Sequence, residues 1–238
     1  MSDRRAQLVR SLLDAYRAGA FPMADPDTGG VTFYTADPRA LLPLDDAEGF
    51  RVPRTVRRTA RRAARDGRRF RVTSDTDPIG VVRGCAVPRP GDGPDSTWIS
   101  NELIALYRAL AGAGALHSVE VWAGPDDDPA LAGGIYGVSL GAAFVAESMF
   151  HDPRPRLASG DRDPHDGSGA SSVALVALAR HLHALGYRLL DIQMVTAHTA
   201  RFGAREVPAD TFMPAFHAAT DGPDRWRPVE PGPADAFV

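Results

Sequence analysis

The feature of this sequence that most constrains its fold is an apolar run near the C-terminus that contains two polar residues two positions apart. Residues 187–195 read YRLLDIQMV, with Asp191 and Gln193 among Leu, Ile, Met and Val. The pattern predicts a buried strand, on which side chains two positions apart share one face. A buried carboxylate and amide need hydrogen-bond partners, because an unpaired buried polar group costs about 1–3 kcal/mol. The pair is therefore either a structural network or a reaction centre.

The composition is that of a globular protein. The chain has 238 residues, of which 44% are hydrophobic, and this is enough for one large domain or for a small and a medium one. The single Cys85 excludes an intramolecular disulfide. The first ten residues contain no apolar segment of a secretory signal, and no run approaches the roughly 18 apolar residues of a membrane span. We therefore expect a cytoplasmic protein that does not associate with membranes.

The basic residues are unevenly distributed. The formal net charge is −3 and all 27 basic residues are Arg, yet ten of them lie between positions 51 and 71 beside one acid, Asp66. Pro53 suits the first position of a helix, and we predict a helix over 54–66 that Gly67 ends. Six arginines recur on it at three- and four-residue spacing and form one cationic stripe. Such a density favours a contact with a nucleic-acid backbone over an ordinary solvated face. The stripe consists of Arg54, Arg57, Arg58, Arg61, Arg62 and Arg65.

Periodicity and turn residues predict the other elements. Helices are expected over 5–17, 102–111 and 171–185, and strands over 31–34, 117–122, 131–138, 143–150 and 187–195. A short helix capped by Thr199 should follow and end at Gly203, whereas the tail from Pro208 has no clear pattern. Residues 151–170 are polar and are expected to form a flexible loop. We predict a small N-terminal domain over 1–45 and a larger catalytic domain over 46–238 that includes the basic helix.

The order of the later elements resembles the second half of a Gcn5-related N-acetyltransferase domain. This order is strand, strand, strand, helix, strand, helix, and it predicts an α+β fold with a mixed, mostly antiparallel sheet flanked by helices. That superfamily holds coenzyme A on a glycine-rich turn, Arg/Gln-x-x-Gly-x-Gly/Ala. Residues 151–172 contain no such turn, so the expected acyl donor is something other than coenzyme A.

A series of local strings then resembles one family, the bacterial leucyl/phenylalanyl-tRNA protein transferases. The strings come in the family's order across about positions 12–208, and together they are far more specific than any one of them. They are 16–23 YRAGAFPM, 36–39 ADPR, 50–58 FRVPRTVRR, 83–86 RGCA, 97–99 TWI, 117–122 HSVEVW, 133–137 GGIYG, 147–150 ESMF and 190–208 LDIQMVTAHTARFGAREVP.

The resemblance implies an activity and a set of partners. Members of the family move Leu or Phe from charged tRNA onto proteins that begin with Arg or Lys, which marks those proteins for degradation. The fold that this implies is a small N-terminal domain followed by an acetyltransferase-like domain, in agreement with the pattern above. No metal or organic cofactor is implied, and we expect a monomer. The basic stripe would then contact the tRNA.

The resemblance also assigns the site. Asp191 and Gln193 would form the catalytic centre, in which Asp191 orients the Gln193 amide and the amide oxygen accepts a hydrogen bond from the incoming amine. Glu147, at the end of an apolar strand, would receive the cationic N-terminus or side chain of the acceptor. Its alternative role is a salt bridge to an arginine. Four residues would line the apolar pocket for the Leu or Phe side chain, although each could equally be ordinary core. They are Met23, Trp98, Ile135 and Met149.

Two other functions remain open at the level of the sequence. The first is a coenzyme A-dependent N-acyltransferase on the same fold. The second is an RNA-binding module that keeps the scaffold without the chemistry.

Overall fold

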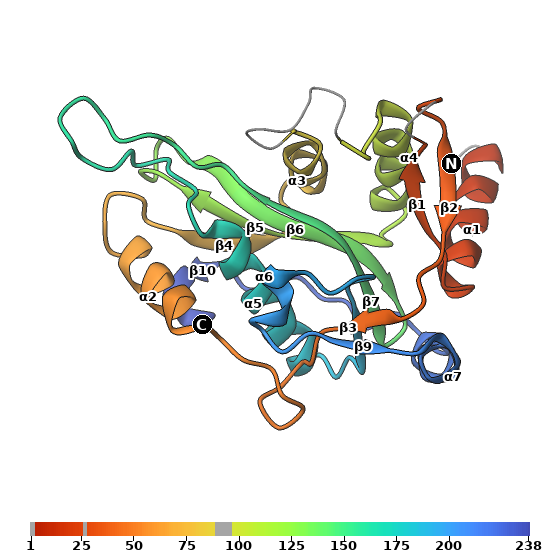
Figure 1. Ribbon diagram of the computed structural model, residues 1–238. Coiled ribbons are helices and arrows are strands. Elements are labelled where there is room, and N and C mark those ends of the chain that lie inside the picture. Colours follow the sequence, from red (N-terminus) through yellow and green to blue (C-terminus); the bar gives the residue numbers. More distant parts are fainter. Residues whose placement is uncertain (1–2, 26–27, 89–96) are drawn as a thin grey trace.

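The computed structural model describes residues 3–25, 28–88 and 97–238, in which an eight-stranded mixed sheet has helices on both faces (Figure 1). The strand order is β10-β4-β5-β6-β7-β8-β3-β9, and the pairs are antiparallel except for the parallel pair β7 and β8. The predicted α+β class with a mixed, mostly antiparallel sheet is therefore confirmed. The strands of this sheet are β3 (Arg39–Leu41), β4 (Arg71–Ser74), β5 (Leu116–Ala123), β6 (Ala130–Leu140), β7 (Ala143–His151), β8 (Leu189–Asp191), β9 (Arg205–Val207) and β10 (Gly232–Pro233).

Seven α-helices and one short 3-10 helix surround the sheet within the described ranges. A separate hairpin of β1 (Phe21–Ala24) and β2 (Val31–Tyr34) lies beside it. The helices are α1 (Asp3–Arg17), α2 (Arg54–Ala63), α3 (Pro78–Cys85), α4 (Asn101–Ala111), α5 (Ala170–Ala184), α6 (Ala197–Ala200), α7 (Ala209–Thr220) and η1 (Ala234–Ala236).

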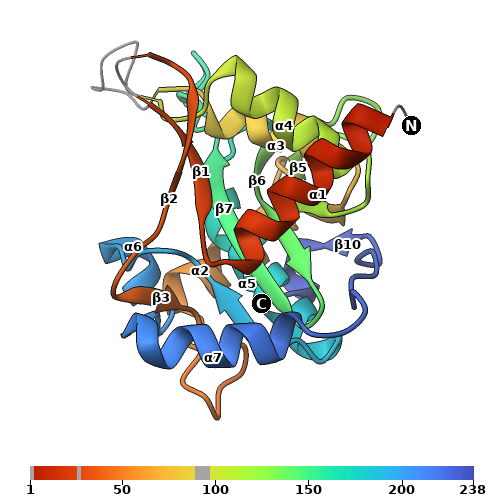
Figure 2. The ribbon, with the colours of Figure 1, turned by 90° about the vertical axis from the view of Figure 1, so that its right-hand side faces the viewer.

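The sheet separates two apolar cores. One core lies between one face of the sheet and helices α5 and α2, and the other lies between the opposite face and helices α3, α4, α1 and α7 (Figures 1 and 2). Helix α5 is buried along most of its length, which suits its Ala-, Val- and Leu-rich sequence. Helix α2 buries only Val56, Ala60 and Ala63, spaced four and three residues apart, and leaves its arginines outside.

Several predicted boundaries were wrong for local reasons. The strand predicted over 187–195 is only β8, because Gln193 has a φ of 57° and takes the chain out of the extended conformation. The helix predicted over 54–66 ends at Ala63, and Asp66 instead accepts hydrogen bonds from the backbone and side chain of Arg68. The short helix after β8 is capped by Thr196 rather than Thr199.

The chain reaches the main sheet early. Strand β3 lies between β8 and β9 in the sheet. Its residues, Arg39–Leu41, precede the predicted domain boundary at residue 45 in the sequence. The division into domains 1–45 and 46–238 therefore stays a prediction. The unassigned tail contains α7, whose buried face is Phe212, Phe216 and Ala219.

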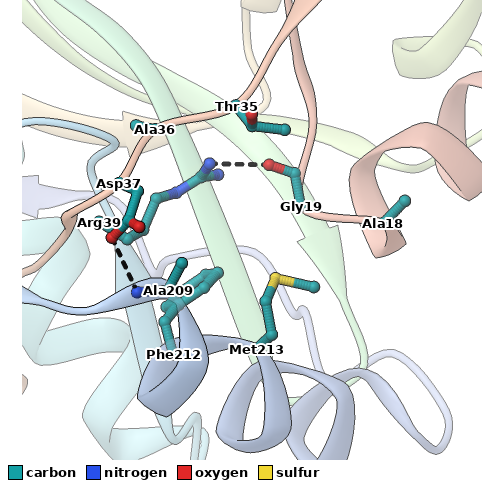
Figure 3. Close-up of a pocket in the computed structure, with 9 residues that line it drawn as sticks. All are labelled: Ala18, Gly19, Thr35, Ala36, Asp37, Arg39, Ala209, Phe212 and Met213. Atoms are coloured by element: carbon teal, nitrogen blue, oxygen red, sulfur yellow. Dashed lines mark hydrogen bonds between the residues drawn. The ribbon is translucent and has the colours of Figure 1, made fainter.

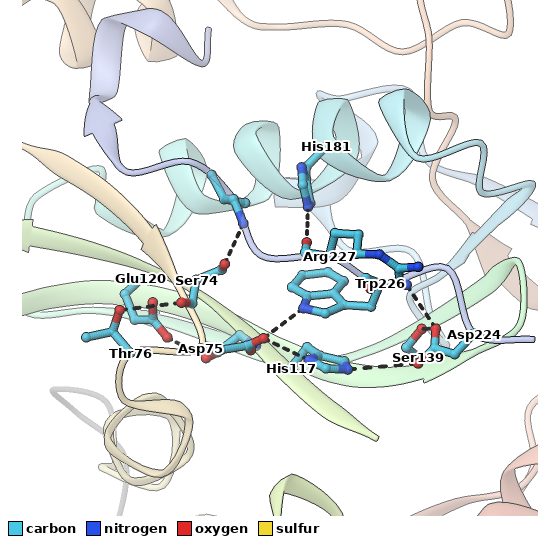
Figure 4. A network of polar contacts seen from close by, with 12 residues as sticks. Ser74, Asp75, Thr76, His117, Glu120, Ser139, His181, Asp224, Trp226 and Arg227 are labelled. Atoms are coloured by element: carbon cyan, nitrogen blue, oxygen red, sulfur yellow. Dashed lines mark hydrogen bonds and ion pairs between the residues drawn. The ribbon is translucent and has the colours of Figure 1, made fainter. Parts of the chain in front are cut away.

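A polar network attaches the C-terminal segment to the sheet (Figure 4). The Trp226 indole donates to Asp75 at 2.7 Å, and its ring stacks on His117 with centroids 4.5 Å apart. Asp75 also contacts His117 at 2.9 Å and accepts from the Ser118 backbone at 2.9 Å. The segment that follows α7 is thereby fixed against β5.

The loop over 151–170 is organised around one carboxylate. Asp166 is fully buried and accepts hydrogen bonds from the Arg154 backbone and from the backbone and hydroxyl of Ser168. Arg162 also binds it, and these hydrogen bonds lower the pKa of Asp166 against the opposing effect of burial, the largest single contribution. In the described ranges, no helix combines the length and the apolar character needed to cross a membrane.

Candidate active site

The candidate site lies where the two parallel strands of the sheet stop pairing. Strands β7 and β8 pair over three positions, the last of which joins Val145 to Asp191. Glu147 and Gln193 each lie two residues beyond this last pair, on opposite sides of the opening. We call this place the β7–β8 fork. On the β7 side, the register with β6 shifts between Tyr136 and Gly137, opposite Glu147.

Asp191 is sealed inside the protein by an ion pair with Arg39. Its side chain is 0% exposed and that of Arg39 is 2% exposed. The Arg39 Nε donates to both carboxylate oxygens at 2.8 and 2.9 Å, and Nη2 donates to Oδ2 at 2.5 Å. The rings of Phe21 and Phe212 lie 5.0 and 5.2 Å from the guanidinium carbon. A carboxylate with this partner is charge-neutralised and does not face an open cavity.

Asp191 does not form a hydrogen bond with the Gln193 side-chain amide. Asp191 Oδ1 instead accepts a hydrogen bond from the backbone N–H of Gln193 at 2.9 Å. The Gln193 carbonyl accepts from the backbone of Ala40 at 3.1 Å. The side chain is thus left free of the carboxylate, and its Nε2 is buried without a hydrogen-bond partner in the described ranges. Such an orphaned donor is costly unless a ligand uses it.

Glu147 is the complementary group on the other side of the fork. Its Oε2 accepts a hydrogen bond from the Tyr107 hydroxyl at 3.0 Å, while Oε1 is buried without a partner among the described residues. Burial raises the pKa of Glu147 to about 7, and the nearby Tyr16 and Tyr107 hydroxyls oppose that rise. No arginine of the described ranges forms an ion pair with it, so the structural alternative of a salt bridge is not what the structure contains.

The four residues predicted to line an apolar pocket form two pairs. Met23 and Trp98 pack against the core that contains α4, and the Ala24 N–H donates to the Trp98 carbonyl at 2.9 Å. Ile135 and Met149 are register partners on β6 and β7 and belong to the core that contains α5. The structure brings together the members of each pair but assigns the pairs to different cores. A shared pocket for the amino-acid side chain stays a prediction.

The cationic stripe is exposed as predicted. All six of its arginines have exposed side chains, five of them on α2 and Arg65 just after it. Arg62 lies 3.9 Å from Asp66, and Arg65 lies 3.4 Å from Asp235. These are weak surface pairs, and they leave the stripe available for anionic groups.

Two cavities lie near these elements. One, of about 290 Å³, is lined by Thr55 and Thr59 of α2, by Gly169 and Ser172 at the start of α5, and by Arg201. The other, of about 210 Å³, lies behind the ion pair and is lined by Arg39 with Gly19, Asp37, Phe212 and Met213, among others (Figure 3). Neither cavity is lined by Glu147 or Gln193. Over the described ranges, no cluster of His, Cys, Asp and Glu forms a metal site.

Sequence reasoning missed Arg39 and Tyr107. Arg39 is in one of the strings that support the resemblance, but its partner lies 152 positions away. Tyr107 falls on the buried face of a predicted helix, where an aromatic residue reads as ordinary core. Buried tyrosine hydroxyls usually find a partner, and this was the only available sign of its role.

Comparisons with known proteins identify the family. The family model "Leucyl/phenylalanyl-tRNA protein transferase" matches residues 44–217, and the model of that family's N-terminal domain matches residues 8–37. Three relatives carry the name leucyl/phenylalanyl-tRNA–protein transferase. The relative from Rhodopseudomonas palustris (strain HaA2) is 44% identical over 213 residues, which are 89% of this chain and 82% of its own. Those from Akkermansia muciniphila and Salinibacter ruber are 40% and 41% identical, over 88% and 94% of this chain and 94% and 85% of their own. The chain therefore belongs to the leucyl/phenylalanyl-tRNA protein transferase family.

Proposed function

We propose that this protein transfers Leu or Phe from aminoacyl-tRNA to the α-amino group of proteins that begin with Arg or Lys. The observation that supports this most directly is the pair of orphaned buried polar atoms, Glu147 Oε1 and Gln193 Nε2, on the two sides of the β7–β8 fork. One is an acceptor and the other a donor, which is what the attack of an amine on an ester requires. The family and its relatives favour this reaction over a coenzyme A-dependent one.

The reaction needs positioning more than covalent chemistry. The neutral α-amine attacks the ester carbonyl, a C–N bond forms, the bond to the ribose oxygen breaks, and one amine proton is transferred to that oxygen. The Gln193 Nε2 would donate to the carbonyl oxygen as it becomes an oxyanion, and the amide oxygen would accept from the attacking amine. Asp191 would act through the backbone of Gln193. Ester bonds to tRNA are already activated, so no intermediate on the enzyme is required.

The acceptor would be recognised by Glu147. Its free Oε1 can accept from a cationic group, because the Tyr107 hydroxyl donates to Oε2 and leaves Oε1 for the ligand. An N-terminal Arg or Lys supplies such a group in addition to its amine. The transfer would mark the acceptor for degradation, and we propose that the protein acts as a monomer in the cytoplasm, where charged tRNA is available.

A transfer assay tests the proposal. The protein is incubated with radiolabelled Leu-tRNA or Phe-tRNA and with peptides that differ only in beginning with Arg, Lys, Ala or N-acetylated Arg. We expect label in the Arg and Lys peptides only. Retention of tRNA without transfer would indicate an RNA-binding module, and equal transfer to the Ala peptide would refute the acceptor specificity. Thermal stabilisation by acetyl-CoA would instead support the coenzyme A alternative.

Replacing Arg58, Arg61 and Arg62 with Ala should weaken tRNA binding and flatten its dependence on salt. Each phosphate contact contributes about 0.7–0.9 to the slope of log K against log salt, so we expect a loss of roughly two to three from its magnitude. Affinity is measured by filter binding at several salt concentrations. A double variant of the exposed Arg4 and Arg10 on α1, at the opposite end of the molecule (Figure 1), is the control. An unchanged slope in the triple variant would remove the stripe from the interface.

Acceptor binding should weaken below pH 7. A carboxyl with a pKa of about 7 is mostly ionised at pH 8 and mostly protonated at pH 6. The acceptor's Arg side chain remains charged throughout. We therefore expect the Kd of an Arg-initiated peptide, measured by fluorescence anisotropy without tRNA, to rise about ten-fold between pH 8 and pH 6. Glu147→Gln should bind weakly at every pH. A wild-type Kd that is flat or falls over this range would exclude Glu147 as the cation's partner.

A further inference from the structure

Arg39 connects several parts of the molecule to the β7–β8 fork. It binds both oxygens of Asp191, and its Nη1 donates to the carbonyl of Gly19, just before β1, at 2.8 Å (Figure 3). Its guanidinium lies between Phe21 of β1 and Phe212 of α7. The hairpin, α7 and β8 therefore meet at one buried cation.

The register of the sheet places Arg39, two residues before Leu41, on the same face as Asp191 of the neighbouring strand. Strand β3 is antiparallel to β8, and Leu41 is the partner of Asp191. Beyond this pair the ladder is irregular, because Ile192 N–H donates to the Ala40 carbonyl while Ala40 N–H donates to the Gln193 carbonyl, so that both Ile192 and Gln193 face Ala40. Arg39 thus reaches Asp191 as a diagonal neighbour on one face of the two strands.

The ion pair also holds Gln193 in a backbone conformation that non-glycine residues rarely adopt. Gln193 has a φ of 57°, and its two backbone polar groups are bonded on both sides, the N–H by Asp191 Oδ1 and the carbonyl by Ala40. A strained residue persists only where its surroundings over-determine it. The backbone direction at this residue decides where the amide with the orphaned Nε2 points.

We propose that Arg39 is a positioning residue for the transfer reaction, which it serves by orienting Asp191 to hold the Gln193 backbone N–H. The inference rests on the proposed function of Gln193. Arg39 does not touch the substrates. The Nε/Nη2 edge of its guanidinium binds both oxygens of the carboxylate, and the carboxylate in turn fixes the conformation from which the Gln193 amide enters the fork.

Two double variants separate this role from simple stabilisation. Arg39→Met with Asp191→Leu replaces the ion pair by apolar side chains that keep the volume but removes the acceptor for the Gln193 N–H. Arg39→Gln with Asp191→Asn also removes both charges but keeps an amide oxygen as that acceptor. Both are compared with wild type by melting temperature, by kcat and KM for Leu transfer to an Arg peptide, and by hydrogen exchange of the Gln193 amide.

The expected results differ between the two variants. The Met/Leu variant should lose at least about 100-fold in kcat, the cost of misplacing a reacting group by roughly 1 Å, with KM for tRNA nearly unchanged. Its Gln193 amide should exchange at least about ten-fold faster. The Gln/Asn variant should recover at least ten-fold of the lost kcat. Arg39→Lys, which keeps the charge without the planar guanidinium, is measured in case a double variant does not fold. Its kcat should fall while its KM values stay unchanged.

Three outcomes would overturn the proposal. They are a folded Met/Leu variant with kcat within three-fold of wild type, an unchanged exchange rate at Gln193, or an equal loss in both double variants. A change in KM without a change in kcat for Arg39→Lys would be a fourth outcome that overturns the proposal. If wild type itself transfers nothing, yet exchange at Gln193 depends on Arg39, then the proposed function fails, whereas the hold of Arg39 and Asp191 on the Gln193 backbone is established.

Discussion

Gln193→Ala is expected to reduce kcat for Leu transfer by about 100-fold or more while tRNA affinity stays near wild type. The substitution removes the amide whose Nε2 is buried and unpaired beside the fork. Loss of a single hydrogen-bond donor to a developing oxyanion typically costs about 10²–10³ in rate. The proposed tRNA contact lies on α2, which this change does not touch. Single-turnover transfer and filter binding measure the two quantities separately.

Gln193→Asn is the matched control for backbone effects. Asn keeps an amide and tolerates a positive φ better than other side chains, so it should fold at least as well as wild type. Its amide is one methylene shorter, and we expect a kcat between those of the Gln and Ala proteins. A collapse of tRNA affinity in the Ala variant, or a kcat within a few-fold of wild type, would show that Gln193 is structural.

Asp191→Ala should destabilise the protein by about 3–5 kcal/mol, because it leaves the guanidinium of Arg39 buried and uncompensated. For a chain of this size the expected decrease in Tm is roughly 6–20 °C. A double variant that combines Arg39→Met with an apolar residue at position 191 should regain most of the lost stability, because it no longer contains an unpaired buried charge. Circular dichroism or calorimetry on the single and double variants gives the comparison.

Asp14→Ala provides the contrast for the same type of interaction at the surface. Asp14 pairs with Arg17 at 3.2 Å, but their side chains are 73% and 50% exposed. Solvent screens such a pair, so little change in Tm is expected. If Asp191→Ala were as mild as Asp14→Ala, the buried ion pair would not be a structural determinant of the fork.

Local patterns predicted the elements whose periodicity does not depend on distant partners. Helix α2 follows from Pro53 at its start, Gly67 beyond its end and arginines at helical spacing, and β5, β6 and β7 follow from three apolar runs separated by turn residues. The prediction failed at β8, where an apolar run continues past Asp191 but the chain turns at Gln193. An apolar run indicates that a segment is buried but does not indicate whether its backbone is extended, so a buried turn and a buried strand have similar sequences.

The residues of the candidate site also fall into those that the sequence predicted and those that it missed. Asp191, Gln193 and Glu147 stand out in the sequence because each is a polar residue in an apolar run, and burial makes such residues costly wherever the chain folds. Arg39 lies in a short turn-like segment instead of an apolar run, so its sequence context does not indicate burial. Tyr107 is hidden among the apolar residues of α4.

The sequence by itself therefore determined which polar groups must be buried, where the positive charge gathers, and the α+β class. Only the tertiary structure decided what those groups contact. The crossing of β3 beside β8 joins Arg39 to a carboxylate 152 positions away, and the packing of α4 on the sheet brings a tyrosine hydroxyl to Glu147. Burial is a property of each residue and its local periodicity, whereas pairing depends on how remote segments approach one another. For that reason the sequence left Asp191 as part of either a structural network or a reaction centre, whereas the folded protein pairs it with Arg39 and leaves unpaired atoms of Glu147 and Gln193 on the two sides of the fork.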